Sequence, residues 1–367
     1  MTNTIDLTKQ LITIPSWVGP GCDEIKVGQF IHDWLRQNTT LAVVKQLVVN
    51  GRFNVIATGA GSIKTLLVGH IDTVENRAGW ISNPWTPVIK NDRLYGLGST
   101  DMKGSLAAML TAISEIKSTD GLMILCYIDE EYDFAGMRQF IKEYRGKIEP
   151  KQIISLDGSV DQIGTGCRGL IEVSFQLRGQ TGHAGRPEAG VNAIVSGLNC
   201  VNKLKRQLAT KYMDPNLGIT TLNVAYCQGG LDNGQGGYGR QGNNIADLAE
   251  FVLDIRTASN VLNSEKIREL LLSYARAAKL KLENWSVRHD LGMWSTPVEY
   301  LIPLFGNAYR YESSLGYIDT QMLWEAFGQI PCATIGAGNL ALAHQPNEYV
   351  ETANLEKTKE LVCQILK

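Results

Sequence analysis

Short apolar runs alternate with helix-like stretches along the first 160 residues of the chain. Runs such as LLVGH and LMILCYI are typical of buried strands, because they end abruptly at polar residues. The pattern predicts strands at residues 42–49, 54–58, 65–68, 122–128 and 152–156, and helices at residues 25–37, 105–116 and 135–144. Strands that alternate with helices indicate an α/β domain with a mostly parallel central sheet.

The pattern changes after about residue 166. Strands are expected at residues 171–177, 220–226, 248–255 and 279–285, and helices at residues 191–208 and 264–278. This β-α-β-β-α-β order is that of a ferredoxin-like sandwich. A strand at residues 332–335 and a helix near 354–366 then restore the first pattern. We therefore expect a discontinuous first domain, residues 1–166 and 287–367, with a second domain, residues 167–286, inserted into it.

Composition narrows the classes of function. Hydrophobic content of 44% and charged content of 20% are ordinary for a globular protein, and a net charge of -2 gives no reason to expect nucleic acid or a membrane surface as partner. No apolar run approaches the roughly 20 residues of a membrane span, and the N-terminus lacks the pattern of a secretory signal. The seven cysteines are scattered and form no CxxC pair, so we expect neither a disulfide framework nor a thiolate zinc site, and a cytoplasmic location.

Residues 228–244 form a glycine-rich segment between two expected strands of the inserted domain. Seven of these seventeen residues are glycine. Two interpretations are open at this point: a mobile hairpin connection, or a loop that closes over substrate.

Candidate chemistry lies where the expected strands end. His70 and Asp72 follow the run LLVG, and Asp101 lies in GLGSTDMKG, just before a small-residue helix. Three adjacent acids, DEE at residues 129–131, follow the run LMILCYI and would repel one another unless a cation lay beside them. Asp157 follows a further strand, and His344 follows a glycine-containing loop.

In an open α/β sheet the carboxyl ends of the strands meet at one crevice, which is where ligands bind. The metal-competent groups are more numerous than one tetrahedral zinc requires, whereas two metals that share a bridging carboxylate would use all five: His70, Asp101, Glu131, Asp157 and His344. Of the five histidines, His32 lies in a helix-like stretch and His289 in a polar stretch, and both are expected to be structural or solvated.

The motifs GHIDTV, GLGSTDMKG, DEE, GQTGHAGRP and AHQPNEYVET resemble those of the co-catalytic zinc aminoacylase and carboxypeptidase family. This family includes acetylornithine deacetylase, succinyl-diaminopimelate desuccinylase and glutamate carboxypeptidase, and the motifs follow its order over almost the whole chain. The resemblance implies a zinc-peptidase-like catalytic domain and an inserted ferredoxin-like domain that serves as lid and dimerisation domain. It also implies two zinc ions, with cobalt or manganese as alternatives.

The resemblance implies a role for each matching residue. His70, Asp101 and Asp157 would hold one zinc, and Asp101 would bridge to a second zinc held by Glu131 and His344. Asp72 would orient His70 from behind, and Glu130 would be the general base.

Three further residues match motifs of the lid domain. His183, in GQTGHAGRP, would donate to the oxyanion from the partner subunit of a homodimer. Asn243 matches the asparagine of a lid motif, here NNIA. Arg256, in LDIRT, would bind a substrate carboxylate, and a structural salt bridge is the alternative for it.

The segments HQPNEYVET, GLGSTDMKG and GWISNPWTP are most similar to the acetylornithine deacetylase branch, which implies a small N-acyl amino acid as substrate. Two features depart from that branch: Asp157 stands in SLDGS where a Glu in a GEP context is usual, and the glycine-rich segment has no match there. Asp at this position is more usual in dipeptidase-like members, so a dipeptidase or carboxypeptidase is the second hypothesis. A non-catalytic relative that only binds amino acids is a third hypothesis, against which the complete set of ligands and base argues.

Overall fold

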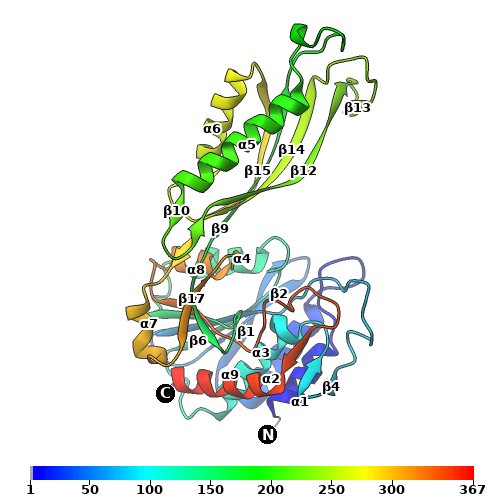
Figure 1. Cartoon of the computed structure of the whole chain (residues 1–367). Coiled ribbons are helices and arrows are strands. Elements are labelled where there is room, and N and C mark those ends of the chain that lie inside the picture. The colour runs from blue at the N-terminus through cyan, green and yellow to red at the C-terminus, as the bar shows by residue number, and fades with distance from the viewer. Residues whose placement is uncertain (1–2) are drawn as a thin grey trace. The chain divides into compact units, whose positions relative to one another are not determined.

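The computed structural model describes residues 3–367, which divide into two compact units (Figure 1). Unit 1 comprises the chain up to Gly166, Ser295–Glu312 and Asp319–Lys367, and unit 2 comprises Cys167–Trp294 and Ser313–Ile318. No helix within residues 3–367 is long and apolar enough to cross a membrane.

Unit 1 is built on a large mixed sheet with strand order β1-β2-β6-β3-β7-β18-β8-β16, and β17 pairs with β8. The four central strands, β6, β3, β7 and β18, run parallel to one another, whereas β1, β2 and β8 are antiparallel to their neighbours. The bounds are β1 Ala42–Val49, β2 Arg52–Thr58, β3 Thr65–His70, β6 Leu122–Tyr127, β7 Gln152–Ser155, β8 Gln162–Cys167, β16 Trp294–Ser295, β17 Arg310–Ser314 and β18 Cys332–Thr334. The mostly parallel central sheet that the sequence predicts is therefore confirmed.

Helices cover both faces of this sheet (Figure 1). On one face α3 packs against α1 and α9, and on the other α4 packs against α8. The central strands β3 and β6 are buried at every residue, as is α3 from Gly104 to Ile113, because each lies between other layers. The helix bounds are α1 Thr4–Ile12, α2 Ile25–Asn38, α3 Gly104–Glu115, α4 Ala135–Tyr144, α7 Val298–Phe305, α8 Thr320–Ala326 and α9 Thr352–Ile365.

A smaller three-stranded sheet in unit 1 has the order β19-β5-β4, with bounds β4 Val88–Lys90, β5 Arg93–Tyr95 and β19 Tyr349–Glu351. This sheet pairs β4 and β5, which lie between His70 and Asp101 in the chain, with β19, which follows His344. The sequence patterns did not predict this sheet, because its strands are only three residues long.

Unit 2 contains a five-stranded antiparallel sheet with order β13-β12-β14-β9-β15, and α5 and α6 lie on one face of it (Figure 1). The bounds are β9 Gly169–Arg178, α5 Ala193–Lys211, β12 Thr221–Asp232, β13 Tyr238–Gly239, β14 Leu248–Thr257, α6 Ser264–Ala277 and β15 Lys281–Leu291, with a short hairpin of β10 Met213–Asp214 and β11 Gly218–Ile219. The apolar positions of β9 and β14 alternate toward the helices and form one core with them.

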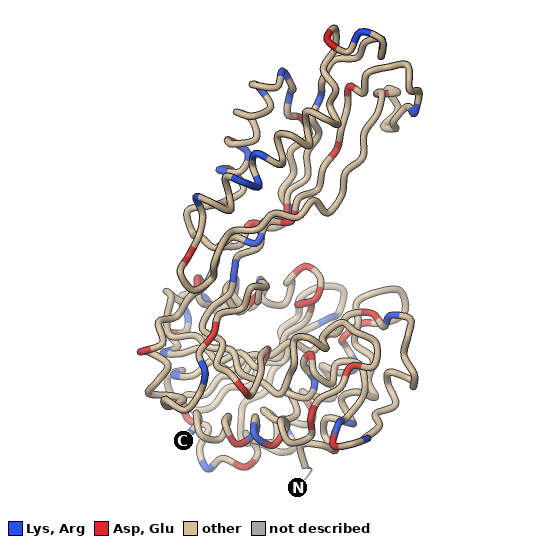
Figure 2. Tube along the Cα trace, in the orientation of Figure 1, with Lys and Arg blue, Asp and Glu red and all other residues tan. Residues whose placement is uncertain are grey.

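The outer face of α5 is basic. Its exposed side chains include Lys203, Lys205, Arg206 and Lys211, and its sequence contains no acidic residue. Figure 2 shows basic positions in blue along this helix. The buried residues Val201, Leu204 and Leu208 lie on the opposite face. Their spacing of three and four residues is why this stretch forms an amphipathic helix against the sheet.

Two strands of unit 2 are longer than the sequence indicates. β15 continues to Leu291 instead of ending near residue 285, and β12 continues to Asp232, into the glycine-rich segment. Gly229 and Gly230 pair with Ala249 and Leu248 of β14, so the first part of this segment is strand. An added Cβ on Gly230 would lie 2.4 Å from the carbonyl oxygen of Gly239, so this close approach of β13 requires glycine.

Candidate metal centre

Four neighbouring parallel strands deliver their carboxyl ends to one region of unit 1. β3 ends at His70, Glu131 follows β6, Asp157 follows β7, and His344 lies beyond β18. Asp101 joins them from the irregular turn η1 (Ser99–Lys103), which leads directly into α3.

The structure brings these five side chains together in two groups that could hold metal ions. One group is His70, Asp101 and Asp157, and the other is Asp101, Glu131 and His344. Within each group, one ligand atom from each residue lies within 4.8 Å of the others. One imidazole and two carboxylates per group form a donor set that suits zinc and similar divalent ions. The residues present therefore fit the two metal ions that the sequence resemblance implies.

Asp101 lies at the centre of this arrangement. Its Oδ1 lies 3.1 Å from Nε2 of His70, and its Oδ2 lies 3.3 Å from Nε2 of His344. Nε2 of His344 lies 2.9 Å from Oε1 of Glu131. A carboxylate whose two oxygens face two different histidines has the geometry of a bridging ligand.

In the metal-free centre, buried carboxyl groups lie close to one another and to two histidines, and this shifts their pKa values. Burial raises the pKa of Asp157 to about 7, with the Asp101 carboxylate adding to the effect. Burial likewise raises the pKa of Glu130 well above its ordinary value, and the neighbouring carboxylates of Asp319 and Glu131 act in the same direction. Contacts with Asp101 and Glu131 raise the pKa of His344 to about 10. Cations in the centre would offset this repulsion between carboxylates.

Asp72 has two sets of contacts. Nδ1 of His70 lies 3.2 Å from the backbone oxygen of Asp72 and 3.5 Å from its Oδ1, which fits the predicted orienting role. The Asp72 carboxylate also accepts the backbone N–H of Glu130 at 3.2 Å and of Glu131 at 3.0 Å. It therefore holds the turn with the expected base and a ligand, which the sequence alone did not indicate.

A buried ion cluster, formed by Arg52, Glu24 and Asp129, also contacts this turn. The guanidinium of Arg52 on β2 contacts Glu24 and Asp129, in each case at 2.5 Å. Asp129, with a positive φ of 71°, directly precedes Glu130, and its second oxygen accepts the backbone N–H of Ala135 at the start of α4. Glu130 is thus presented by a turn whose backbone is fixed at several points.

The three predicted residues of the inserted domain lie in unit 2. His183 is exposed, and its neighbour Ala184 donates its backbone N–H to the carbonyl of Asn243 at 2.9 Å, so these two motifs lie side by side. Arg256 lies on β14, where its Nε and Nη2 both donate to the carboxylate of Asp254 at 2.9 Å. An ion pair of this kind agrees with the alternative interpretation of Arg256 as part of a structural salt bridge.

Two buried acids near the centre were not found by sequence reasoning. Asp319, at the start of α8, accepts the hydroxyl proton of Tyr127 at 2.7 Å, and its Oδ2 has no hydrogen-bond partner within residues 3–367. Glu348 accepts backbone N–H groups from the Asp101 loop. Asp319 follows no recognisable strand, whereas Glu348 lies within the motif HQPNEYVET, which was its only signal.

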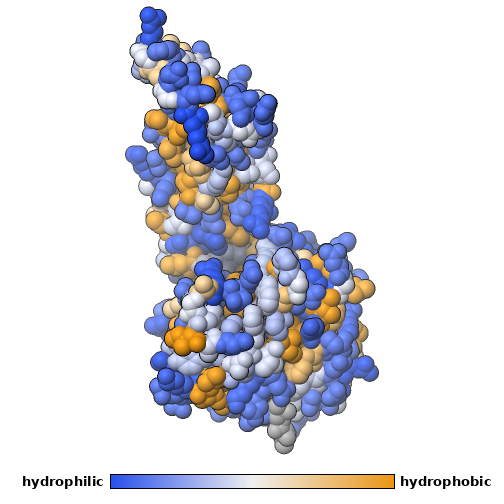
Figure 3. Space-filling view, turned by 90° about the vertical axis from the view of Figure 1, so that its right-hand side faces the viewer, coloured by the Kyte–Doolittle hydropathy of each residue, from blue (hydrophilic) through white to orange (hydrophobic). Residues whose placement is uncertain are grey.

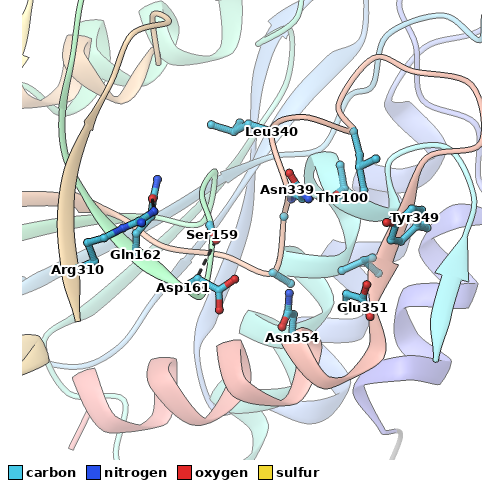
Figure 4. Close-up of a pocket in the computed structure, with 14 residues that line it drawn as sticks. Thr100, Ser159, Asp161, Gln162, Arg310, Asn339, Leu340, Tyr349, Glu351 and Asn354 are labelled. Carbon is cyan, nitrogen blue, oxygen red and sulfur yellow. Dashed lines mark hydrogen bonds between the residues drawn. The ribbon is translucent and has the colours of Figure 1, made fainter. Parts of the chain in front are cut away.

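A separate pocket of about 400 Å³ borders the Asp101 loop through Thr100 (Figure 4). Asp161, Arg310, Asn339 and Glu351 also line it, and the hydroxyl of Thr100 accepts the backbone N–H of Asn339 at 2.8 Å. None of the five metal-competent residues lines this pocket. It is therefore distinct from the candidate metal centre.

The chain is similar to known hydrolases along its length. The model of peptidase family M20/M25/M40 matches residues 66–367. The acetylornithine deacetylase of Proteus mirabilis (strain HI4320) is 28% identical, over 99% of this chain and 95% of that protein. The acetylornithine deacetylase of Pectobacterium atrosepticum is 29% identical, over 86% of this chain and 83% of that protein.

Solved structures share the fold at lower identity. An M20 family metallo-carboxypeptidase from Sulfolobus solfataricus superposes with a TM-score of 0.78 at 19% identity, over 100% of this chain and 99% of that one. A dinuclear metal-binding M20 peptidase from Bacillus subtilis superposes with a TM-score of 0.70 at 15% identity, over 99% of this chain and 96% of that one. At these identities the likeness concerns the fold.

Proposed function

Because the chain belongs to peptidase family M20/M25/M40, we propose that it is a metal-dependent hydrolase that cleaves the amide bond of a small N-acyl amino acid. The observation that carries this proposal is the pair of ligand groups that share Asp101, with Glu130 on the turn beside them. Two relatives named acetylornithine deacetylase, aligned over most of their length, support an N-acyl amino acid of that type as substrate.

In the proposed site, His70, Asp101 and Asp157 hold one divalent ion, and Asp101, Glu131 and His344 hold the other. We propose zinc, with cobalt or manganese as alternatives that suit the same ligands. When bound, two such ions supply Lewis acidity that lowers the pKa of a water and polarises an amide carbonyl.

Glu130 is the proposed general base. Its carboxyl is buried on the turn that also carries the ligand Glu131, and in the metal-free protein burial raises its pKa. A positioned carboxylate of this kind serves as a general base in hydrolysis. Glu130 takes a proton from the attacking water and then donates it to the leaving amine. Asp72 keeps the backbone of Glu130 fixed during both transfers, because the Glu130 N–H donates to its carboxylate.

Unit 2, which contains the predicted inserted domain of residues 167–286, is proposed to act as a ferredoxin-like lid. Its long strands and helices follow the order β9-α5-β12-β14-α6-β15, and the sheet order β15-β9-β14-β12 is that of a ferredoxin-like fold. His183 and Asn243, on adjacent segments of this domain, are the proposed oxyanion donor and a substrate contact. Arg256 is the proposed carboxylate contact, which would require it to exchange Asp254 for substrate.

A homodimer through this domain is proposed because β12 has an open edge. β13 pairs only with Leu231 and Asp232, and within residues 3–367 no other strand pairs with that edge of β12. Val224 and Tyr226 on this strand are 37% and 44% exposed, and apolar areas are visible on unit 2 in Figure 3. An exposed strand edge with apolar side chains favours pairing with a second chain.

The proposed location is cytoplasmic, because all seven cysteines are free and disulfides are rare in that compartment.

A complementation experiment tests the role of His183 across such a dimer. His183→Ala should lower turnover about 10²–10³-fold, as loss of an oxyanion donor does. Mixing this variant with Glu130→Gln should restore activity, because a mixed dimer combines an intact Glu130 with an intact His183 of the partner. No recovery in a mixture shown to exchange subunits would contradict the arrangement.

The second candidate is a dipeptidase or carboxypeptidase of the same family. Asp157, in place of the Glu expected for the deacetylase branch, favours it. A release assay over N-acetylornithine, other N-acetyl amino acids and a panel of dipeptides separates the two. Hydrolysis of dipeptides with no release from any N-acyl amino acid would overturn the first proposal.

A further inference from the structure

Glu348 is a buried residue whose side-chain carboxylate accepts hydrogen bonds from the loop that carries Asp101. It is 2% exposed and follows His344 by four residues. Its Oε2 accepts the backbone N–H of Gly98 at 2.9 Å. Its Oε1 accepts the backbone N–H groups of Thr100 at 2.7 Å and Asp101 at 3.1 Å.

The Asp101 loop cannot satisfy these N–H groups by itself. Gly98 has a left-handed φ of 78°, and the φ and ψ angles of Asp101 and Met102 are not helical, although α3 begins directly afterwards. Buried backbone N–H groups require a partner. A carboxylate supplies two oxygens, which here accept from three such donors.

The segment that contains Glu348 also contacts the exposed loop at residues 79–81. The Asn347 side chain accepts the backbone N–H of Ile81 at 2.8 Å and donates to the carbonyl of Gly79 at 3.2 Å. Residues 79 and 81 follow His70 and Asp72 in the chain. The segment 344–348 thus supplies one candidate ligand and is fixed both to the Asp101 loop and to the exposed loop at residues 79–81.

We propose that Glu348 is a positioning residue for Asp101, and that through Asp101 it sets the affinity of both metal positions. The reason is geometric, because Asp101 is the one residue common to both ligand groups and its own N–H is among the three that Glu348 accepts. A shift of this loop therefore displaces a ligand of each metal at once. The inference rests on the proposed two-metal site.

Glu348→Gln tests the inference with little change of shape. In the glutamine an NH₂ group replaces one of the two accepting oxygens. This NH₂ group cannot accept a hydrogen bond from a backbone N–H, so at least one bond to the Asp101 loop is lost. Competition between the protein and a chelator for Zn²⁺ should show both equivalents bound about 10–100-fold more weakly, the range found when partners of metal ligands are lost. Turnover should recover when zinc is raised, because Glu348 touches no reacting group.

Glu351→Gln is the matched control on the same segment. Glu351 is half-exposed and its side chain pairs with Arg93 at 3.0 Å, and within residues 3–367 no hydrogen bond joins that side chain to the Asp101 loop. Its replacement should leave both zinc affinities unchanged. Wild-type affinity for both equivalents in Glu348→Gln would overturn the inference, and so would a loss confined to one equivalent.

A measurement on the wild-type protein covers the case in which Glu348→Gln does not fold. Hydrogen exchange of the metal-free protein should show the amides of Gly98, Thr100 and Asp101 protected, since they bond to a buried side chain. Exchange at the rate of an open loop would overturn the inference. Wild-type protein that binds no metal would instead refute the proposed function, so the two failures are distinguishable.

Discussion

Glu130→Gln should separate proton transfer from metal binding. The substitution keeps the size of the side chain and removes its ability to accept and return a proton. Glu130 belongs to neither ligand group, and the Asp72 carboxylate holds it through its backbone N–H at 3.2 Å, which the substitution leaves in place. Both metal positions should therefore stay intact. General acid–base catalysis contributes typically about 10²–10⁴-fold, so kcat should fall by a factor in this range.

The adjacent residue provides the control. Oε1 of Glu131 lies 2.9 Å from Nε2 of His344, in the second ligand group. Glu131→Gln should therefore lower the metal content, whereas Glu130→Gln should leave it unchanged. The assay pairs metal analysis with the initial rate of amine release at saturating substrate. A Glu130→Gln enzyme with two metals and a kcat within threefold or so of wild type would refute the role of Glu130, since the loss of a general base exceeds that factor.

Three further substitutions test the surroundings of the centre. Asp101→Ala should abolish metal binding at both positions, whereas His70→Ala should weaken metal binding mainly at one. If titration showed the same loss of bound metal in the two variants, a bridging Asp101 would be contradicted. Burial raises the pKa of Asp157 from 3.8 to about 7 in the metal-free protein, so its contribution to stability is complete below pH 3.8 and is lost as the pH rises through 7. Asp157→Asn should flatten the decrease in Tm over this range in chelator, and an unchanged slope would refute this cause. Arg52→Met leaves two buried carboxylates without a cation and should cost about 3–5 kcal/mol in denaturant unfolding; a cost below 1 kcal/mol or so would show that the cluster is not a brace.

The sequence located the central strands and the candidate ligands for a physical reason. Strands buried on both faces are continuous apolar runs, and each such run ends where a polar side chain first becomes tolerable. His70 and Asp157 lie at or next to the carboxyl ends of their strands, and parallel strands bring these ends together. Asp101 and His344 follow no strand directly, so the strand-end argument grouped them with the other ligands only as metal-competent loop residues, and the family resemblance supplied their individual roles.

Other features depend on contacts that no local pattern encodes. Glu348 acts on the Asp101 loop across about 250 residues of chain, through backbone N–H groups that are identical in every sequence apart from proline. Asp319 contacts Tyr127 across 192 residues. The extension of β12 into the glycine-rich segment was missed because glycine ordinarily weakens strands, and here neighbouring backbone replaces the side chains.

The most direct test of the two-metal centre is the stoichiometry of metal binding to the chelator-treated protein. Titration with Zn²⁺, followed by calorimetry and by metal analysis after dialysis, should show two equivalents per chain. In Asp101→Ala both should be lost, while the protein stays folded. A wild-type protein that binds no zinc, or only one equivalent at any concentration, would contradict the two-metal centre.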